Sequence, residues 1–250
     1  MKRTTVGTFA WARATGGVLT FRDRMVLLPR LLGPGLAASL RTLARSGRNV
    51  ALSLDEIRIP DSAAVSLAHE EMAEACSPPL VQHSLRTYLW AAGFAHVDGI
   101  RHDPELLLVA SLLHDVGLSD RRRSESCRCF TLDSAIAAAG VLGKAGWDEA
   151  RTTVVADAIC LHMNGCSSLE DGAEAYLLQQ ATACDVVGTR YYDFEKRFRD
   201  SVVRRHPRLK VNGEVSDLMR NEAKTRRSSR AALLCSLGLP LMVRMNPFGE

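Results

Sequence analysis

The sequence predicts an all-α protein, a helical bundle with helical extensions at both ends. Apolar residues recur with the three-to-four-residue period of an α-helix through most of the chain. Almost no stretch shows the two-residue alternation of a half-buried strand. Helix-start signals, in which a capping Asp or Ser precedes proline or a run of strong helix formers, recur near residues 61, 77 and 103.

Residues 1–59 form an N-terminal extension in this interpretation. Residues 1–20 have no clear period, and the apolar pattern of residues 22–46 is interrupted by Pro29 and by the Gly-Pro-Gly at 33–35. Because proline inside a helix removes a hydrogen bond and clashes with the preceding turn, we expect a short helix, a break and a second helix. This extension would pack against the core or cover a substrate.

Residues 60–200 carry the strongest helical pattern and are expected to form the core bundle. The expected helices span residues 61–75, 79–95, 104–116, 131–142, 147–162 and 177–199, the last as one helix or two abutting ones. Gly117 suits a left-handed helix stop. The charged, aperiodic segment that follows, residues 120–129, should be a loop.

Residues 201–250 form a C-terminal helical extension. The pattern weakens after Pro207, with helices expected near residues 215–226 and 231–237. Neither an internal repeat nor a low-complexity segment is found in the sequence.

Composition narrows the class of protein. Charged residues interrupt every apolar stretch before the roughly 18 residues of a membrane span, and arginines occupy the region where an export signal needs an unbroken apolar core. The seven cysteines lack the density of a disulfide scaffold, so reduced thiols in a cytoplasmic protein are expected. The formal charge of +4 is mild and does not itself predict nucleic-acid binding.

Five ionisable side chains fall on otherwise apolar helix faces. At helical spacing, His83, His114, His162 and Asp185 each continue a stripe of apolar or small residues, and Asp115 follows His114 directly. A lone histidine on such a face is usually a core residue. The order His, then His-Asp, then Asp across three helices is far less expected by chance.

A buried aspartate is costly unless it is paired with a cation or a metal. No Arg or Lys continues the same stripes, so we expect a divalent metal as the common positive partner. The candidate ligands are His83, His114, Asp115 and Asp185. Nitrogen and oxygen donors suit Zn, Mn, Fe or Ni.

This order of residues resembles the HD-domain superfamily of metal-dependent hydrolases, over roughly residues 80–190. More narrowly, HSLRTYLWA at 83–91, CFTLDSAIAA at 129–138, AICLHM at 158–163, ACDVVGTR at 183–190 and the closing NPFGE are similar to the subfamily that includes fungal cyanamide hydratases. The resemblance implies an HD-domain helical bundle and metal ligation by His83, His114, Asp115 and Asp185.

The resemblance also indicates how many metals are bound. Two-metal members of the superfamily carry additional histidines between the His-Asp doublet and the last Asp, whereas residues 116–184 of this chain contain only His162. One divalent ion, Zn or otherwise Fe, Mn or Ni, is therefore expected. His162 would lie behind the ligands or face the substrate.

A metal-activated water acting on a small molecule is the expected chemistry. Asp115 could orient that water or accept its proton, and His162 could donate a proton to the leaving group.

The substrate contacts are expected from Arg86, His162 and Arg121, the last in an arginine triplet, 121–123, that favours a phosphoester. A small apolar pocket would instead suit a cyanamide or nitrile hydratase-like hydro-lyase. A third alternative is a non-catalytic HD-like ligand-sensing module, against which the complete ligand set argues.

Other signals point to no further partner class. The basic runs at 204–210 and 224–230 lack interleaved aromatics, so solvated helix ends or a homo-oligomer contact are expected rather than nucleic acid. No membrane partner is expected. Cys160, His162 and Cys166, and Cys127 with Cys129, lack the paired spacing of a structural zinc site, and free thiols are expected.

Overall fold

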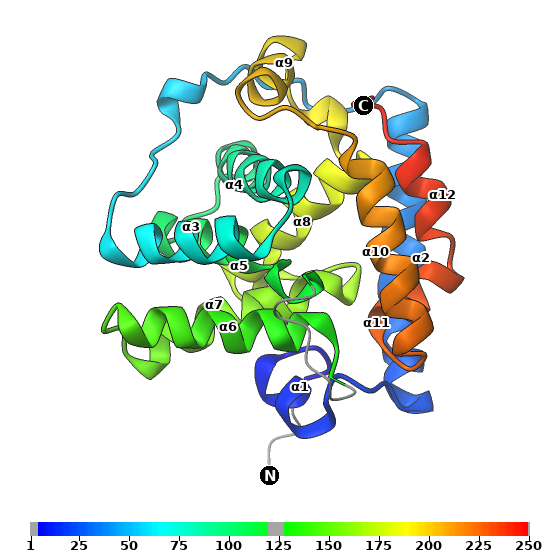
Figure 1. Ribbon diagram of the computed structural model, residues 1–250. Helices are drawn as coiled ribbons and strands as arrows, with labels where there is room; N and C mark the ends of the chain where they lie inside the picture. The colour runs from blue at the N-terminus through cyan, green and yellow to red at the C-terminus, as the bar shows by residue number, and fades with distance from the viewer. Residues whose placement is uncertain (1–4, 120–127, 250) are drawn as a thin grey trace.

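The computed structural model describes residues 5–119 and 128–249, which contain twelve α-helices and no strand (Figure 1). A single isolated bridge joins Val50 and Phe194. The all-α prediction is confirmed. The helices are α1 Phe9–Thr15, α2 Phe21–Leu43, α3 Ala63–Ala75, α4 Pro78–Asp98, α5 Pro104–Leu113, α6 Phe130–Lys144, α7 Glu149–Leu161, α8 Ala173–Val187, α9 Lys196–Arg205, α10 Val211–Thr225, α11 Arg230–Ser236 and α12 Leu239–Arg244. None of these described helices has the length and apolar character needed to cross a membrane.

Helix α5 is the centre of the bundle. Asp103 caps its first turn by accepting from the backbone N–H groups of Glu105 and Leu106, and Pro104 occupies a position where a missing N–H costs nothing. All residues from Leu106 to Leu113 are buried. Such a helix, apolar on every side, must be surrounded, and α3, α4, α6, α7 and α8 all lie against it. The His-Asp doublet at its C-terminal end is therefore delivered to the interior of the protein.

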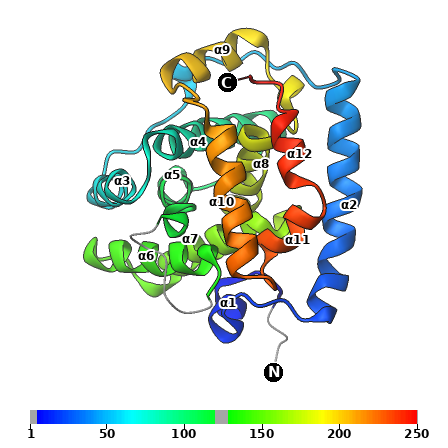
Figure 2. The same cartoon turned by 45° about the vertical axis from the view of Figure 1, so that its right-hand side comes forward.

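Helix α2 is continuous, and the expected break at Pro29 and residues 33–35 is wrong. Leu27 is buried, and Leu28 and Leu31 pack against the main core. Burial of these leucines offsets the hydrogen bonds that the prolines remove. Figure 2 shows α2 along the right-hand edge of the molecule, and in Figure 1 it lies on the same side as α10 and α12.

Gly117 does not adopt the left-handed conformation expected for a helix stop. Helix α5 ends at Leu113, His114 remains helical, and a 3-10 turn covers Val116–Leu118. Gly117 instead permits a close approach to α6, because a Cβ there would lie 2.2 Å from the carbonyl oxygen of Phe130 and 2.7 Å from the amide nitrogen of Ser134. Its own N–H donates to the Ser134 hydroxyl at 2.9 Å.

We therefore expect Gly117→Ala to lower the free energy of unfolding by about 1–3 kcal/mol, the usual cost of overpacking. Both colliding atoms belong to backbone and cannot rotate away. Gly140→Ala is the matched control, because a Cβ at Gly140 on α6 meets nothing within 4 Å, and alanine should slightly favour that helix. Urea unfolding of the two variants measures the difference. Equal stability of both variants would show that the contact with α6 is not tight.

The last three helices pack along one side of the core. Helix α10 lies against α4 and α11, and α12 lies against α8 and α10 (Figure 2). A second apolar cluster forms between these helices and the core, separate from the main one. Its buried members are Leu80, Leu118, Phe130, Val211, Val215, Met219 and Ala231.

Candidate metal centre

Three side chains converge at the C-terminal end of α5. The Nε2 atoms of His83, from α4, and His114 lie 3.2 Å apart. Oδ2 of Asp115 lies 3.2 Å from Nε2 of His114 and 3.6 Å from Nε2 of His83. One ligand atom from each residue lies within 4.8 Å of the other two, and all three residues are buried.

Hydrogen bonds on the far side of each ring set the tautomers of the two histidines. Nδ1 of His114 donates to the Ser111 carbonyl at 2.8 Å, and Nδ1 of His83 donates to Oδ2 of Asp185 at 2.7 Å. With both Nδ1 protons used in this way, each Nε2 carries a lone pair. Two ring lone pairs and a carboxylate oxygen then face one another, and none can donate to the others. A divalent cation fits this donor set.

Without a metal, a proton can hold the cluster together. Burial opposes a charge on His114, but the adjacent Asp115 carboxylate outweighs it and raises the pKa of His114 above its ordinary value. Burial would raise the pKa of Asp115, yet the imidazoles of His114, His162 and His83 hold it well below its usual range. Burial lowers the pKa of His83 despite Asp185. Because a metal competes with a proton for Nε2 of His114, metal binding should tighten as pH rises.

Asp185, the fourth expected ligand, lies behind His83 rather than beside the other three. Its Oδ2 accepts from His83 and from Nη2 of Arg86 at 2.9 Å. Its Oδ1 accepts from Nε of Arg86 and Nε1 of Trp90, both at 2.8 Å, with Nη1 of Arg208 at 3.4 Å. Burial opposes ionisation, but the Arg86 guanidinium, His83 and Arg208 hold the pKa of Asp185 well below its usual range. In this geometry Asp185 orients His83 and does not reach the three converging atoms.

Arg86, the expected substrate contact, is engaged with other protein groups, and its contact with a substrate stays a prediction. Its side chain is fully buried and spans from Asp185 to the carbonyls of His206 and Pro207, which accept from Nη1 at 3.0 and 2.8 Å. The expectation that no Arg or Lys lies on the helix faces that carry the candidate ligands is wrong, because Arg86 of α4 reaches Asp185. Arg86 follows His83 by three residues, and this spacing was the available signal that it would reach the same carboxylate.

His206 shows that the surroundings of Arg86 disfavour an additional positive charge. Burial, Arg205 and Arg86 lower the pKa of His206 to about 4, and its Nδ1 lies 3.1 Å from Oε1 of Gln82. Because the unfolded chain keeps a histidine pKa of about 6.5, it binds the proton more readily than the folded protein does. The contribution of His206 to stability is therefore complete above pH 6.5 and decreases as pH falls toward 4.

We expect His206→Gln to reduce the loss of stability between pH 6.5 and 4. Urea midpoints of the metal-free protein at several pH values in this window, for wild type and variant, measure the effect. His96→Gln, at an exposed position on α4, is the control and should follow the wild-type curve. If both variants lose stability as steeply as the wild type, His206 is not the group responsible.

His162 lies beside the doublet with its proton on the far side of the ring. Nδ1 donates to the Ile159 carbonyl at 2.6 Å, and Nε2 lies 3.8 Å from Oδ1 of Asp115. Burial, followed by the positive charge of His114, lowers the pKa of His162 to about 3. Because Nδ1 donates to the Ile159 carbonyl, Nε2 of the neutral ring is a proton acceptor. The proton-donating role expected from the sequence stays a prediction. The phenyl ring of Phe130 packs 5.8 Å from the imidazole, centroid to centroid.

Residues of the second apolar cluster adjoin the centre along the chain. Leu80 lies one turn before His83, Leu118 follows Asp115 by three residues, and the partly buried Met163 follows His162. The cluster also includes Val211, Val215 and Met219 of α10, which the sequence did not single out. The expected substrate contact Arg121, with Arg122 and Arg123, lies outside the described residues.

One known family model matches the segment that carries these residues. Residues 80–186 match the family model of the HD domain. The match supports the HD superfamily for the segment that carries His83, the His-Asp doublet, His162 and Asp185. HD domains bind divalent metals and are generally hydrolases. No curated protein matches the chain, and the narrower likeness to cyanamide hydratases stays a prediction.

Proposed function

We propose that the protein is a metal-dependent HD hydrolase that activates water for attack on a small molecule. The observation that carries the proposal is the convergence of Nε2 of His83, Nε2 of His114 and Oδ2 of Asp115, with both histidine tautomers set from behind. These atoms would hold one divalent ion, Zn or otherwise Fe, Mn or Ni. Such an ion supplies Lewis acidity that lowers the pKa of bound water toward neutrality.

Asp115 and His162 are the residues proposed to handle the proton. Oδ1 of Asp115 and Nε2 of His162 are both acceptors, and their separation of 3.8 Å is too long for a direct hydrogen bond. A water between them could be oriented by both atoms and give its proton to either. Phe130, packed on His162, shields this side from bulk solvent.

Two substrate classes follow from the sequence, a phosphoester and a small uncharged molecule with a nitrile-type carbon. A phosphoester needs cationic groups near the centre, but Arg86 is engaged with Asp185 and backbone carbonyls. The arginine triplet at 121–123 lies outside the described residues. A small uncharged substrate, such as one with a nitrile-type carbon to which water adds, would instead need an apolar pocket beside the centre. Phe130, which packs on His162, supplies one apolar side chain there.

The test is a comparison of metal-free and metal-loaded protein. Metal analysis should find one divalent ion per chain. Protein reloaded with Zn, Fe(II), Mn or Ni should then be screened against phosphomonoesters, nucleotides, cyclic nucleotides, nitriles and cyanamide. Metal-dependent turnover of the uncharged substrates alone would support a hydratase, and phosphate release would support the phosphohydrolase. Absence of stoichiometric metal would reject the proposed function in favour of a sensing module.

A further inference from the structure

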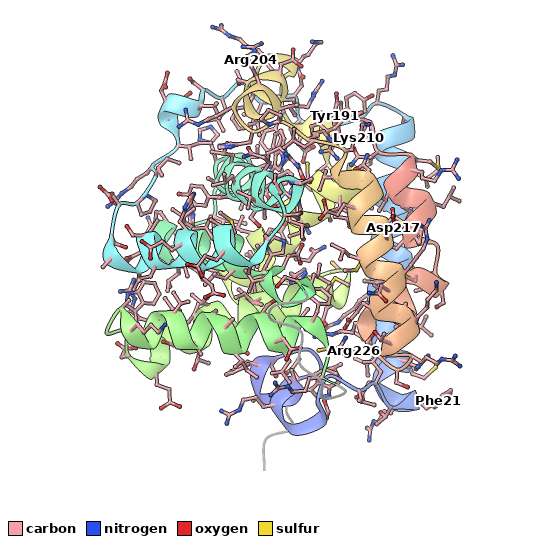
Figure 3. All side chains as sticks on the ribbon, viewed as in Figure 1. Phe21, Tyr191, Arg204, Lys210, Asp217 and Arg226 are labelled. Carbon is pink, nitrogen blue, oxygen red and sulfur yellow. The ribbon has the colours of Figure 1, made fainter. Side chains whose placement is uncertain are left out.

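The last described residues, Asn246 to Gly249, pack against the end of α8 and against residues that surround Asp185. They follow α12 and end at the corner of the molecule where the C-terminus is marked in Figure 1. Tyr191, labelled at that corner in Figure 3, contacts Phe248 with the ring centroids 4.6 Å apart. The tail also contacts Trp90 and Arg208, two residues that donate hydrogen bonds to the Asp185 carboxylate.

Asn246 fixes the backbone at the end of α8. Its Nδ2 donates to the carbonyl oxygens of Asp185 and Val186 at 2.8 and 2.9 Å. Carbonyls in the last turn of a helix have no partner within the helix, so the amide supplies one. Oδ1 of Asn246 accepts from the N–H of Phe248 at 3.0 Å, and Pro247 packs so closely on Gly188 that a Cβ there would lie 2.2 Å from its Cδ.

Phe248 and Gly249 fix two of the donors to the Asp185 carboxylate. The rings of Phe248 and Trp90 lie 5.1 Å apart, and Nε1 of Trp90 donates to Oδ1 of Asp185. The carbonyl of Gly249 accepts from Nε of Arg208 at 2.8 Å. The guanidinium of Arg208 packs over Phe248 at 5.4 Å and reaches Oδ1 through Nη1. The tail thus supports the backbone of Asp185 and the donors to its side chain.

We infer that residues 246–249 are a positioning element for the metal centre. By fixing Asp185 they keep the His83 proton on Nδ1 and leave Nε2 free to bind metal. This inference rests on the proposed function. A carboxylate that orients a ligating histidine typically changes metal affinity by about 10–100-fold, and an effect transmitted from the tail should approach the lower end of that range.

The experiment compares Asn246→Ala, Phe248→Ala and Phe248→Tyr with Met245→Ala, a neighbouring position that is 72% exposed. The tautomer of His83 is read from the nitrogen resonances of its ring in the metal-free protein, assigned with His83→Gln. Affinity is read from titration with Zn²⁺. Asn246→Ala and Phe248→Ala should give a mixture of His83 tautomers and about tenfold weaker binding. Phe248→Tyr should restore both properties, and Met245→Ala should change neither.

The His83 tautomer and the Zn²⁺ affinity distinguish failure of this inference from failure of the proposed function. A lower melting temperature with an unchanged His83 tautomer and unchanged Zn²⁺ affinity would show that the tail only stabilises the fold, and would overturn the inference. If the wild type binds no metal, the proposed function fails, whereas the tautomer comparison still decides whether the tail positions His83. If Asn246→Ala does not fold, the Phe248 pair decides the question.

Discussion

Replacing Asp115 with Ala is expected to abolish both bound metal and hydrolytic activity while the helical content survives. The variant removes the only carboxylate oxygen among the three converging atoms, so the charge that attracts the cation is lost and metal affinity should fall by more than about 100-fold. Asp115 follows α5, and its side chain makes no cap hydrogen bond to the 3-10 turn Val116–Leu118, so we expect the helical content to survive the loss of its carboxylate. His114→Ala should have the same effect because it removes one of the two imidazole ligands.

Metal content after dialysis, Zn²⁺ affinity and far-ultraviolet circular dichroism measure this prediction. Asp217→Ala is the control, because the Asp217 side chain is 80% exposed on the outer face of α10 (Figure 3). It should bind metal and turn over substrate as the wild type does. Retained activity, or stoichiometric metal, in Asp115→Ala or His114→Ala would contradict the proposed centre.

Local sequence signals were sufficient to find the converging residues. The helical period places His83 and His114 on faces that must be buried, and α4 and α5 lie against each other in the bundle. Asp115 follows from adjacency to His114. Each of these inferences needs only the face of one helix and the general rule that apolar faces meet.

The partners of Asp185 could not be derived in the same way. A stripe on α8 identifies a buried carboxylate but does not say which side chain from another segment will reach it. Arg208 precedes α10, and Trp90 lies two turns after His83 on α4. Their hydrogen bonds to Asp185 arise from packing between segments far apart in the sequence. The position of the tail could not be predicted either, because its NPFGE motif has no helical periodicity from which a contact with Trp90 could be inferred.

Backbone conformation at glycine and proline was also decided by tertiary packing. Gly117 was expected to stop a helix because glycine often does so. Glycine is required at this position because the Phe130 carbonyl of α6 leaves no room for a Cβ. Only the folded bundle brings that carbonyl near residue 117. The prolines of α2 have a high intrinsic cost in a helix, and burial of Leu27 and its neighbours against the core outweighs that cost.

Breaking the pair between Arg86 and Asp185 is expected to be the largest single loss of stability. Both side chains are fully buried, so Arg86→Met would leave a carboxylate without its two-pronged partner, and a loss of about 3–5 kcal/mol is typical of such changes. Arg204→Met, at an exposed position of α9, should be nearly neutral. In a cycle with Asp185→Asn, the double variant should lose less than the sum of the single losses, by about 0.5–3 kcal/mol. Additive losses from urea unfolding would show that the pair is not coupled.

Asp185→Asn also distinguishes an orienting residue from a ligand. If Asp185 acts only through Nδ1 of His83, the variant should still bind one Zn²⁺ per chain, with affinity about 10–100-fold weaker, since Nε2 of His83, His114 and Asp115 all remain. If Asp185 ligates the metal directly, as the family resemblance implies, binding should be lost as completely as in Asp115→Ala. Titration of the folded variant with Zn²⁺, without urea and at a temperature well below its melting point, separates the two results. The hydrogen bonds from Arg86, Trp90 and His83 to the two carboxylate oxygens favour the first.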